Sequence, residues 1–445
     1  MRISMRIRFA IPCMAFVLFM CAAITPAQAV PPIQQQRLPN GMRVLLMEAH
    51  NVPMVSMKLS LAGGSRFDAA GKGGTASLLA DMISDHTARH AHPVWDDLLD
   101  ADAIKLGAGA GRDDFSLGLT VLKDALKPGL DAFSEALLQP GWDQKRFAIL
   151  KHDAISAARK SREEPGVRAA QAAAALLFAH HPYGHRPGGT VKSLQRIKLD
   201  DLKALYAAQV KPSGAVLAVS GDITMAELLP LLKSRLKGWR GKPATGLMDI
   251  SRPAGVAGKQ ADVALPTTQM LVQLLRLGPS RSDADFFPAF VLNHILGSGG
   301  FASRLMQEVR EDRGLVYGVY SYFQPLAAPG PFVITLQTKA DQAKEAESVV
   351  RHVLSDMAAG HISNKQLKAA TENLTGSFAQ RMDSNRERVG LISMIGLYNL
   401  PLDYLSSWTA RVQAVTLAQV KAQAAKYLKP EAWNRVRVGP KSALN

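Results

Sequence analysis

The chain has 445 residues and a formal net charge of +16, and 47% of its residues are hydrophobic and 20% charged. This balance is typical of a globular protein and excludes a disordered or low-complexity chain. The positive charge is spread along the sequence without a nucleic-acid-binding motif, so we do not expect a nucleic-acid partner.

Residues 1–29 have the three parts of a secretory signal peptide. An apolar stretch from Phe9 to Ile24 is followed by Ala27-Gln28-Ala29, an A-x-A cleavage site, and preceded by the basic residues Arg2, Arg6 and Arg8. The apolar stretch is short for a membrane span, which needs roughly 20 residues, and this favours a cleaved signal over an anchor. We therefore expect an exported, periplasmic protein without a stable membrane span.

Both cysteines, Cys13 and Cys21, lie within this segment. The mature chain can therefore form no disulfide, no thiolate metal site and no cysteine nucleophile. Removal of residues 1–29 leaves 416 residues (445 − 29) and lowers the net charge from +16 to +13, since three arginines are lost. That length exceeds the roughly 250–300 residues of a single core, so two or more domains are expected.

The two halves of the mature chain resemble each other. Two pairs of short segments recur at nearly one offset, namely residues 64–68 with 279–283 and residues 211–212 with 429–430. The offsets are 215 (279 − 64) and 218 (429 − 211). The alternative is accidental similarity, but a duplicated lobe of about 200 residues is a plausible domain size. A segment rich in Gly and Pro separates the halves, which predicts lobes at residues 30–240 and 263–445 joined by a linker at 241–262.

Each lobe mixes strands and helices. Residues 55–61 and 117–121 alternate apolar and polar side chains, as half-buried strands do. Ser363 with Gln366 and Thr416 with Gln419 form capping boxes at the start of two predicted helices. Antiparallel strands beside separate helices favour an α+β fold over a doubly wound one.

One stretch of the second half concentrates the candidate functional residues. Gly297, Gly299 and Gly300 permit a tightly turned backbone before a helix that we predict over residues 302–312. Arg310 then lies in the last helical turn, and Tyr317 lies on a strand predicted to start near Val316. A short turn between them would bring both side chains to one cleft.

The string Gly-Gly-x-x-Ser-Arg-Leu-x-Gln-Glu-Val-Arg-Glu-x-Arg-Gly-Leu-x-Tyr, which ends at Tyr317, resembles the Arg/Tyr segment of the pitrilysin/insulinase family of zinc peptidases, the inverzincins. In that family the Arg and the Tyr bind the peptide backbone and stabilise the tetrahedral intermediate, which assigns these roles to Arg310 and Tyr317. The resemblance extends over nearly all of the mature chain, through residues 38–41, 181–184, 220–222 and 400–404. It implies two homologous lobes, each a mixed, largely antiparallel sheet packed with helices, that form half of a clam shell.

The family's metal motif, His-x-x-Glu-His, falls on the predicted helix that starts at Gly74. Here its three positions hold Ser77, Ala80 and Asp81, and the position of the third ligand falls near Ala157. Zinc requires three protein ligands and a carboxylate base for its water, whereas Asp81 alone offers one oxygen. The resemblance therefore implies a chain that binds no cofactor itself, with zinc on a partner chain.

Other polar clusters offer weaker alternatives. Asp85, His86, His90 and His92 could share a metal if they lay on one helix, but a helix end followed by a loop of solvated histidines is the favoured interpretation. His180, His181 and His185 flank a turn that matches the family, so we interpret them as structural. We interpret the charge pairs Asp113-Asp114 and Glu163-Glu164 as solvated loop residues.

Some family members divide catalysis between two chains, one with the zinc motif and one with the Arg/Tyr pair. By this resemblance the chain is an exported, zinc-free subunit of a heteromeric metallopeptidase, inactive alone, whose partners are a zinc-bearing subunit and a peptide or unfolded polypeptide. Two alternatives stay open. One is a non-catalytic scaffold or chamber protein, similar to the core subunits of respiratory complexes. The other is a monomeric peptide-binding protein that acts alone.

The signal sequence predicts that the native protein begins at Val30. An intact-mass measurement on protein from the periplasmic fraction should give the mass of residues 30–445. A membrane-bound chain that keeps residues 1–29 would contradict the prediction.

Overall fold

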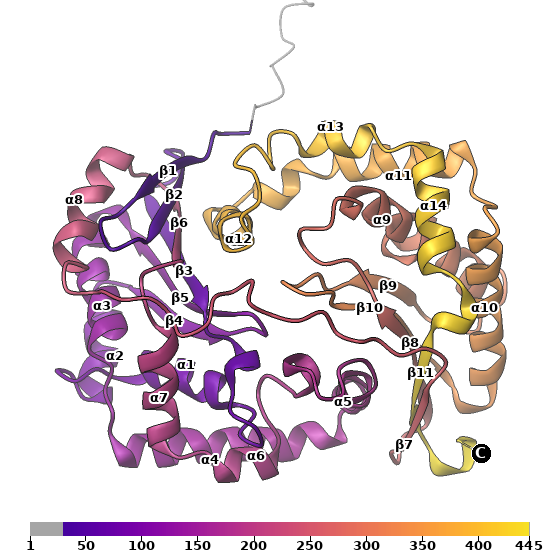
Figure 1. Cartoon of the computed structure of the whole chain (residues 1–445), viewed down its shortest axis with the longest axis horizontal. Helices are drawn as coiled ribbons and strands as arrows, with labels where there is room; N and C mark the ends of the chain where they lie inside the picture. The colour runs from indigo at the N-terminus through magenta and orange to yellow at the C-terminus, as the bar shows by residue number, and fades with distance from the viewer. Residues whose placement is uncertain (1–29, 445) are drawn as a thin grey trace, which may run out of the picture.

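The computed structural model describes residues 30–444, so the predicted signal segment lies outside the described residues. Two lobes lie side by side, each built of one sheet and its helices (Figure 1). The first lobe contains β1 (Gln34–Arg37), β2 (Arg43–Glu48), β3 (Met54–Ala62), α1 (Thr75–Asp85), α2 (His92–Ala101), β4 (Lys105–Ala110), β5 (Asp114–Leu122), α3 (Leu126–Leu138), α4 (Gln144–Lys160), α5 (Pro165–Leu177), α6 (Val191–Arg196), α7 (Leu199–Gln209), β6 (Val216–Gly221) and α8 (Met225–Arg235).

The second lobe contains β7 (Gln260–Ala264), β8 (Gln269–Leu277), α9 (Phe286–Asn293), the π-helices η5 (His294–Ser298) and η7 (Met306–Glu311), β9 (Val319–Phe323), β10 (Pro331–Lys339), α10 (Ala343–Ala358), α11 (Asn364–Gly376), α12 (Asn385–Leu397), α13 (Trp408–Gln413), α14 (Leu417–Tyr427) and β11 (Asn434–Gly439). The predicted strands at residues 55–61 and 117–121 are β3 and β5. Both predicted capping boxes are present, at the starts of α11 and α14.

The sheet topology confirms two homologous lobes with an α+β fold. The strand orders are β1-β2-β6-β3-β5-β4 and β7-β11-β8-β10-β9, so the two sheets match once β1 is set aside. In each sheet one pair is parallel, β2 with β6 and β7 with β11, and the remaining pairs are antiparallel. Each sheet is therefore mixed and largely antiparallel, as predicted.

The boundary between the lobes differs slightly from the predicted linker. Strand β7 starts at Gln260, which is paired with Arg435 of β11, so residues 260–262 belong to the second sheet. The segment before it crosses between the lobes without helix or strand (Figure 1). Arg66 of the first lobe donates to the carbonyl oxygens of Gly246 and Leu247 at 2.8 and 2.6 Å, and these bonds hold the segment to that lobe.

Each lobe covers part of the other lobe's sheet with one of its own helices. Helix α12 packs on β2, β3 and β6, and α5 packs on β7, β8 and β11 (Figure 1). A Cβ atom at Gly396 of α12 would lie 2.4 Å from Val216 and 2.7 Å from Leu45, so only glycine permits this approach. The two sheets are thus joined through a shared apolar core.

Asp113 was expected to be a solvated loop residue, and this prediction is wrong. Its side chain is buried, with 1% of its surface exposed, and it lies between the lobes. It accepts hydrogen bonds from the hydroxyl of Tyr183 in the first lobe, and from the Tyr398 hydroxyl at 3.0 Å and the Ala327 amide at 2.8 Å in the second. The Arg66 guanidinium lies 3.9 Å away. Burial, reinforced by the Asp113 charge, raises the pKa of Tyr183 and of Tyr398, so both hydroxyls stay protonated donors.

The sequence gives a run of two acids after a Gly-Arg pair, and nothing in it distinguishes a solvated pair from a buried one. Asp114 is half-buried at the start of β5, whereas Glu163 and Glu164 are exposed, as expected. The partners of Asp113 lie 70 to 285 residues away, which no local pattern indicates.

The contacts of Asp113 predict its effect on stability. Asp113→Ala should lower the free energy of unfolding by about 3–5 kcal/mol, because it leaves Arg66 and three donors unpaired in a buried site. Tyr398→Phe, which removes one hydrogen bond to a carboxylate, should lower it by about 1.5–3 kcal/mol. Urea unfolding measures both, with Glu163→Ala, an exposed acid of the same lobe, as a control expected within about 0.5 kcal/mol of wild type. Equal midpoints for Asp113→Ala and the control would contradict the bridging role.

Candidate functional site

The Arg/Tyr segment runs from η5 to β9 and contains both π-helices. Such helices are rare and often occur at functional sites. Gly297 at the end of η5 lies directly against β9, because a Cβ there would be 2.6 Å from the Ser321 hydroxyl. Gly300 then reverses the chain with a φ of +61°, a conformation that favours glycine. The predicted glycine turn is therefore present.

The helix and strand around Arg310 and Tyr317 differ in detail from the prediction. The helix is a π-helix over Met306–Glu311, and β9 starts only at Val319, so Tyr317 lies in the connecting loop and not on the strand. Gly314, with a φ of +64°, ends the helix. Leu315 is buried and its carbonyl oxygen accepts from Thr338, which fixes the loop two residues before Tyr317.

Tyr317 faces solvent, whereas Arg310 is half-buried. The Arg310 guanidinium lies 4.8 Å from the centroid of the Phe301 ring and forms an ion pair with its neighbour Glu311. Tyr317 has 89% of its surface exposed, and its hydroxyl makes no hydrogen bond within residues 30–444. Phe301 and Tyr320 are also exposed, at 67% and 50%, so this segment presents three aromatic side chains and a cation to solvent. No contact in the described chain joins Arg310 to Tyr317.

The positions of the metal motif lie on α1 and α4, which pack against each other. The Ser77 hydroxyl donates to the Pro187 carbonyl oxygen at 3.0 Å, Ala80 is buried, and Asp81 and Ala157 are exposed. Surrounding protein atoms and the Asp85 charge raise the pKa of Asp81, although it keeps contact with solvent. These four side chains do not fit the zinc site that the family implies. The hydroxyl of Ser77 is already bonded to a carbonyl oxygen, Ala80 and Ala157 offer only methyl groups, and a single carboxylate remains. Within residues 30–444, no group of three or more His, Cys, Asp or Glu side chains is arranged to hold a metal ion.

The histidines after α1 were expected to be solvated, and this is wrong for His86. Asp85 and His86 are buried, at 9% and 4% exposure, and form a hydrogen bond of 2.9 Å. Arg146 of α4 binds both oxygens of Asp85. Burial disfavours the charge of Asp85, but the hydrogen bonds from Arg146 and His86 outweigh this effect and lower its pKa. The cluster therefore fastens α1 to α4 as an ion pair with an adjoining histidine.

The histidines around residues 181–184 have structural partners. His181 contacts the Ser251 carbonyl oxygen at 3.0 Å, and His185 contacts Asp68 at 3.2 Å. Asp68 in turn accepts from the amides of Gly74 and Ala76, at 2.7 and 2.8 Å, and so caps the first turn of α1. Their structural interpretation from the sequence agrees with these contacts.

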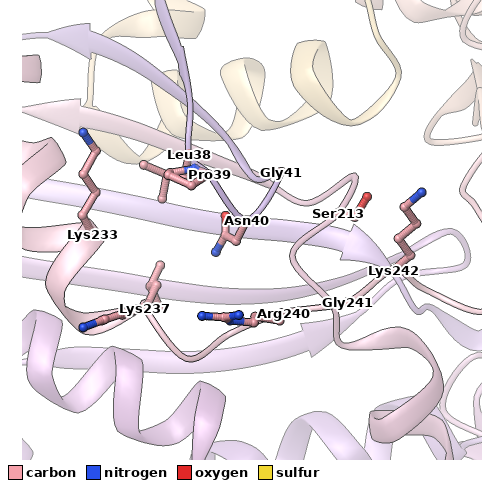
Figure 2. Close-up of a pocket in the computed structure, with 11 residues that line it drawn as sticks. Leu38, Pro39, Asn40, Gly41, Ser213, Lys233, Lys237, Arg240, Gly241 and Lys242 are labelled. Atoms are coloured by element: carbon pink, nitrogen blue, oxygen red, sulfur yellow. The ribbon is translucent and has the colours of Figure 1, made fainter.

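A basic pocket of about 740 Å³ lies in the first lobe, away from the Arg/Tyr segment. Figure 2 shows it between the turn Leu38–Gly41 and the chain that follows α8, with Arg240 opposite Asn40. Four cations line it, and none of them has an ion pair within the described residues: Lys233, Lys237, Arg240 and Lys242. All four are exposed, as solvated surface cations are. The sequence analysis did not single them out, because their spacing matches no motif.

Known proteins share this fold over almost the whole chain. A crystal structure of the peptidase M16 inactive domain from Pseudomonas fluorescens is 31% identical, with a TM-score of 0.87 over 92% of this chain and 98% of that one. A protease from Helicobacter pylori is 18% identical, with a TM-score of 0.85 over 92% of this chain and 100% of that one. The second likeness shows the fold alone.

Relatives with curated names also match most of this chain. A non-peptidase homologue from Helicobacter pylori is 25% identical over 87% of this chain and 88% of its own length. A probable mitochondrial-processing peptidase subunit beta from Arabidopsis thaliana is 22% identical over 90% of this chain and 77% of its own length. None of the helices within residues 30–444 is long and apolar enough to cross a membrane.

Two family models match the two lobes in turn. The model described as insulinase (peptidase family M16) matches residues 43–181, and the one described as the peptidase M16 inactive domain matches residues 196–374. Together with the two-lobed fold and a metal motif reduced to one carboxylate, these matches confirm the resemblance found in the sequence: the chain belongs to the insulinase family of peptidases, family M16.

Proposed function

We propose that this chain is an exported, zinc-free subunit of a heteromeric metallopeptidase, and that it binds a peptide for hydrolysis at a zinc site on a partner chain. The exposure of Tyr317, with the half-buried Arg310 seven residues before it, is the observation that carries the proposal. Tyr183 and Tyr398, which have structural roles, are buried or half-buried and hydrogen-bonded through their hydroxyls. Tyr317 has neither property, so its hydroxyl is available to another molecule.

The side chains of Arg310 and Tyr317 suit a peptide bond in the transition state of its hydrolysis. The Arg310 guanidinium offers several donors in a fixed geometry to a backbone carbonyl or a carboxylate. Within residues 30–444 its one charged partner is the adjacent Glu311, and surface pairs of this kind contribute little to stability and are easily exchanged. The Tyr317 hydroxyl would donate to the oxyanion that develops on the attacked carbonyl.

The first lobe offers a surface for an extended peptide. Strand β4 is the edge strand of its sheet and contains Gly107 and Gly109. A groove of about 650 Å³ lies between β4, β5, β3 and α12. An extended peptide can add to an exposed sheet edge through main-chain hydrogen bonds, and nothing lies within 4 Å of where a Cβ of Gly107 would be. Both lobes thus contribute to peptide binding in this proposal.

The names of two relatives support a role in an assembly without catalysis by this chain. The Helicobacter pylori relative is named a non-peptidase homologue, and the Arabidopsis thaliana relative is named as a subunit. A chain that lacks the metal ligands matches the first name, and the second supports membership in a peptidase assembly. The partner in this proposal carries a His-x-x-Glu-His motif.

We predict that the isolated chain holds no stoichiometric zinc and cuts no peptide. The reason is that the positions of the metal ligands and the base hold Ser77, Ala80, Asp81 and Ala157. Elemental analysis of dialysed protein, with a peptidase assay on the same sample, tests this. One zinc per chain would contradict the proposal and would direct attention to the cluster of Asp85, His86, His90 and His92.

In a complex reconstituted with the zinc-bearing chain, Tyr317→Phe should slow turnover by about 10²–10³, the usual effect of losing one oxyanion donor. Arg310→Ala should also raise KM if the contact exists in the ground state. The matched control is Tyr320→Phe, which removes the hydroxyl of an exposed tyrosine on β9 and should leave the rate unchanged. Steady-state kinetics with a fluorogenic peptide measure all three variants.

If a complex with both Arg310→Ala and Tyr317→Phe cut peptides at the wild-type rate, neither residue would act on substrate. The scaffold role would then describe the chain better. Co-purification with a zinc-bearing chain from the native envelope fraction tests the partnership separately, since a monomer would favour a peptide-binding protein that acts alone.

A further inference from the structure

The second lobe contains a polar pocket of about 430 Å³ that we call the arginine pocket. It lies between α9, η5, the end of β9 and α11. The polar side chains that line it include Arg281, Asn293, His294, Ser298, Asn373 and Arg381. Its lining has no acidic residue, although it holds two guanidinium groups.

Arg281 has no counter-charge. It lies over the rings of Phe286 and Tyr398, at 5.4 and 5.9 Å from their centroids, and these contacts fix its orientation. Its Nε is buried without a hydrogen-bond partner, and its side chain makes no ion pair within residues 30–444. Its side chain is half-buried, and this burial lowers its pKa. Desolvated charges in proteins are normally paired, so an unpaired one facing a pocket indicates a missing anion.

Arg381 is the second arginine of the pocket; it is exposed, and it makes no ion pair within residues 30–444. Its guanidinium lies 5.9 Å from the ring of Phe290 and 5.7 Å from that of Trp408. Some partly buried arginines have carboxylates beside them, as Arg146 has Asp85 and Arg437 has Asp262, whereas Arg276 stacks on Tyr427 without an ion pair in the described chain. The arginine pocket differs in that two guanidinium groups without ion pairs line one cavity.

The remaining polar groups suit an anion held by hydrogen bonds. Asn373 is hydrogen-bonded to His294, and burial together with the Arg381 charge lowers the pKa of His294. Two planar guanidinium forks match the geometry of a carboxylate, which arginine binds through paired donors. The aromatic rings of Phe286, Phe290, Tyr322 and Phe323 also line the pocket, so an apolar side chain can accompany the charge.

The pocket occupies a defined place in the duplicated fold. By sheet order α9 and α11 correspond to α1 and α4, the helices that carry the degenerate metal motif in the first lobe. One wall is formed by Tyr322 and Phe323 at the end of β9, the strand that starts two residues after Tyr317. A peptide lying along this strand would have one end near Tyr317 and the other near the two arginines.

We propose that the arginine pocket binds the terminal carboxylate of a peptide, with the last side chain against its aromatic wall. This inference rests on the proposed function only in taking the ligand to be a peptide. The aromatic wall favours a carboxylate that carries an apolar side chain over a free phosphate ion. The N–H donors of both guanidinium groups would form hydrogen bonds to the two oxygens of one carboxylate.

The test compares two labelled peptides of one sequence, one ending in a free carboxylate and the other in an amide, by fluorescence anisotropy with the purified protein. The acid should bind about 10- to 100-fold more tightly than the amide, the usual effect of a charge-assisted hydrogen bond pair. Arg381→Gln should abolish this difference and leave the affinity of the amide unchanged. Arg411→Gln is the matched control, because Arg411 also stacks on two rings of the second lobe but lies outside the pocket.

A third peptide, amidated and ending in Glu, distinguishes a terminal from a side-chain carboxylate and should bind more weakly than the acid. Arg281→Lys keeps the charge but removes the fork, and should reduce the preference for the acid without unfolding the chain, as thermal melting would show. Equal binding of acid and amide, equal losses in Arg381→Gln and Arg411→Gln, or no binding of either peptide would overturn the assignment. None of these results decides the role of Arg310 and Tyr317, which hydrolysis by the reconstituted complex tests.

Discussion

The two lobes meet at one buried carboxylate. Asp113 receives hydrogen bonds from a tyrosine of its own lobe and from a tyrosine and an amide of the other, and Arg66 balances its charge. Arg66 also binds the connecting segment through two carbonyl oxygens. A carboxylate in this position requires all of these donors at once, since an unpaired buried charge is strongly unfavourable. Together with the packing of α5 and α12 across the lobes, this cluster fixes the relative position of the two lobes.

The first lobe lacks the family's metal ligands, whereas the second lobe contains the Arg/Tyr pair. In the first lobe the α1–α4 pair is held by the Asp85–Arg146 ion pair and by the Asp68 cap, so its packing does not require a metal. In the second lobe the corresponding helices, α9 and α11, border the pocket that Arg281 and Arg381 line. Tyr317 is exposed and Arg310 is half-buried on a segment whose backbone is fixed by Gly297 and Leu315. A rigid backbone beneath exposed polar side chains is what a binding surface requires.

Sequence reasoning reached those features whose physical cause is local. Alternating strands, capping boxes and the glycine turn each depend on a few neighbouring residues, and the structure contains them. The internal offsets of 215 and 218 residues correctly indicated the duplication. Asp113 and His86 were misjudged because their burial depends on partners that only the tertiary fold brings near. The arginine pocket was missed for the same reason, since Arg281 and Arg381 are 100 residues apart (381 − 281) and belong to no motif. The start of β9 was placed too early, because buried Leu315 and Val316 resemble strand residues but lie in the loop.

The exchange of α5 and α12 between the lobes carries an implication for how such a chain arose. Two separate half-length copies, each with one helix extended onto its neighbour's sheet, would form a two-fold symmetric, domain-swapped dimer with the same contacts. A connection such as the one before β7 would turn that dimer into a single polypeptide without new packing. Once the copies were fused, each could diverge alone, because the other still supplied its covering helix. Loss of metal ligands from one half, with arginines in the matching place of the other, is a form of divergence that a strictly symmetric dimer could not have reached.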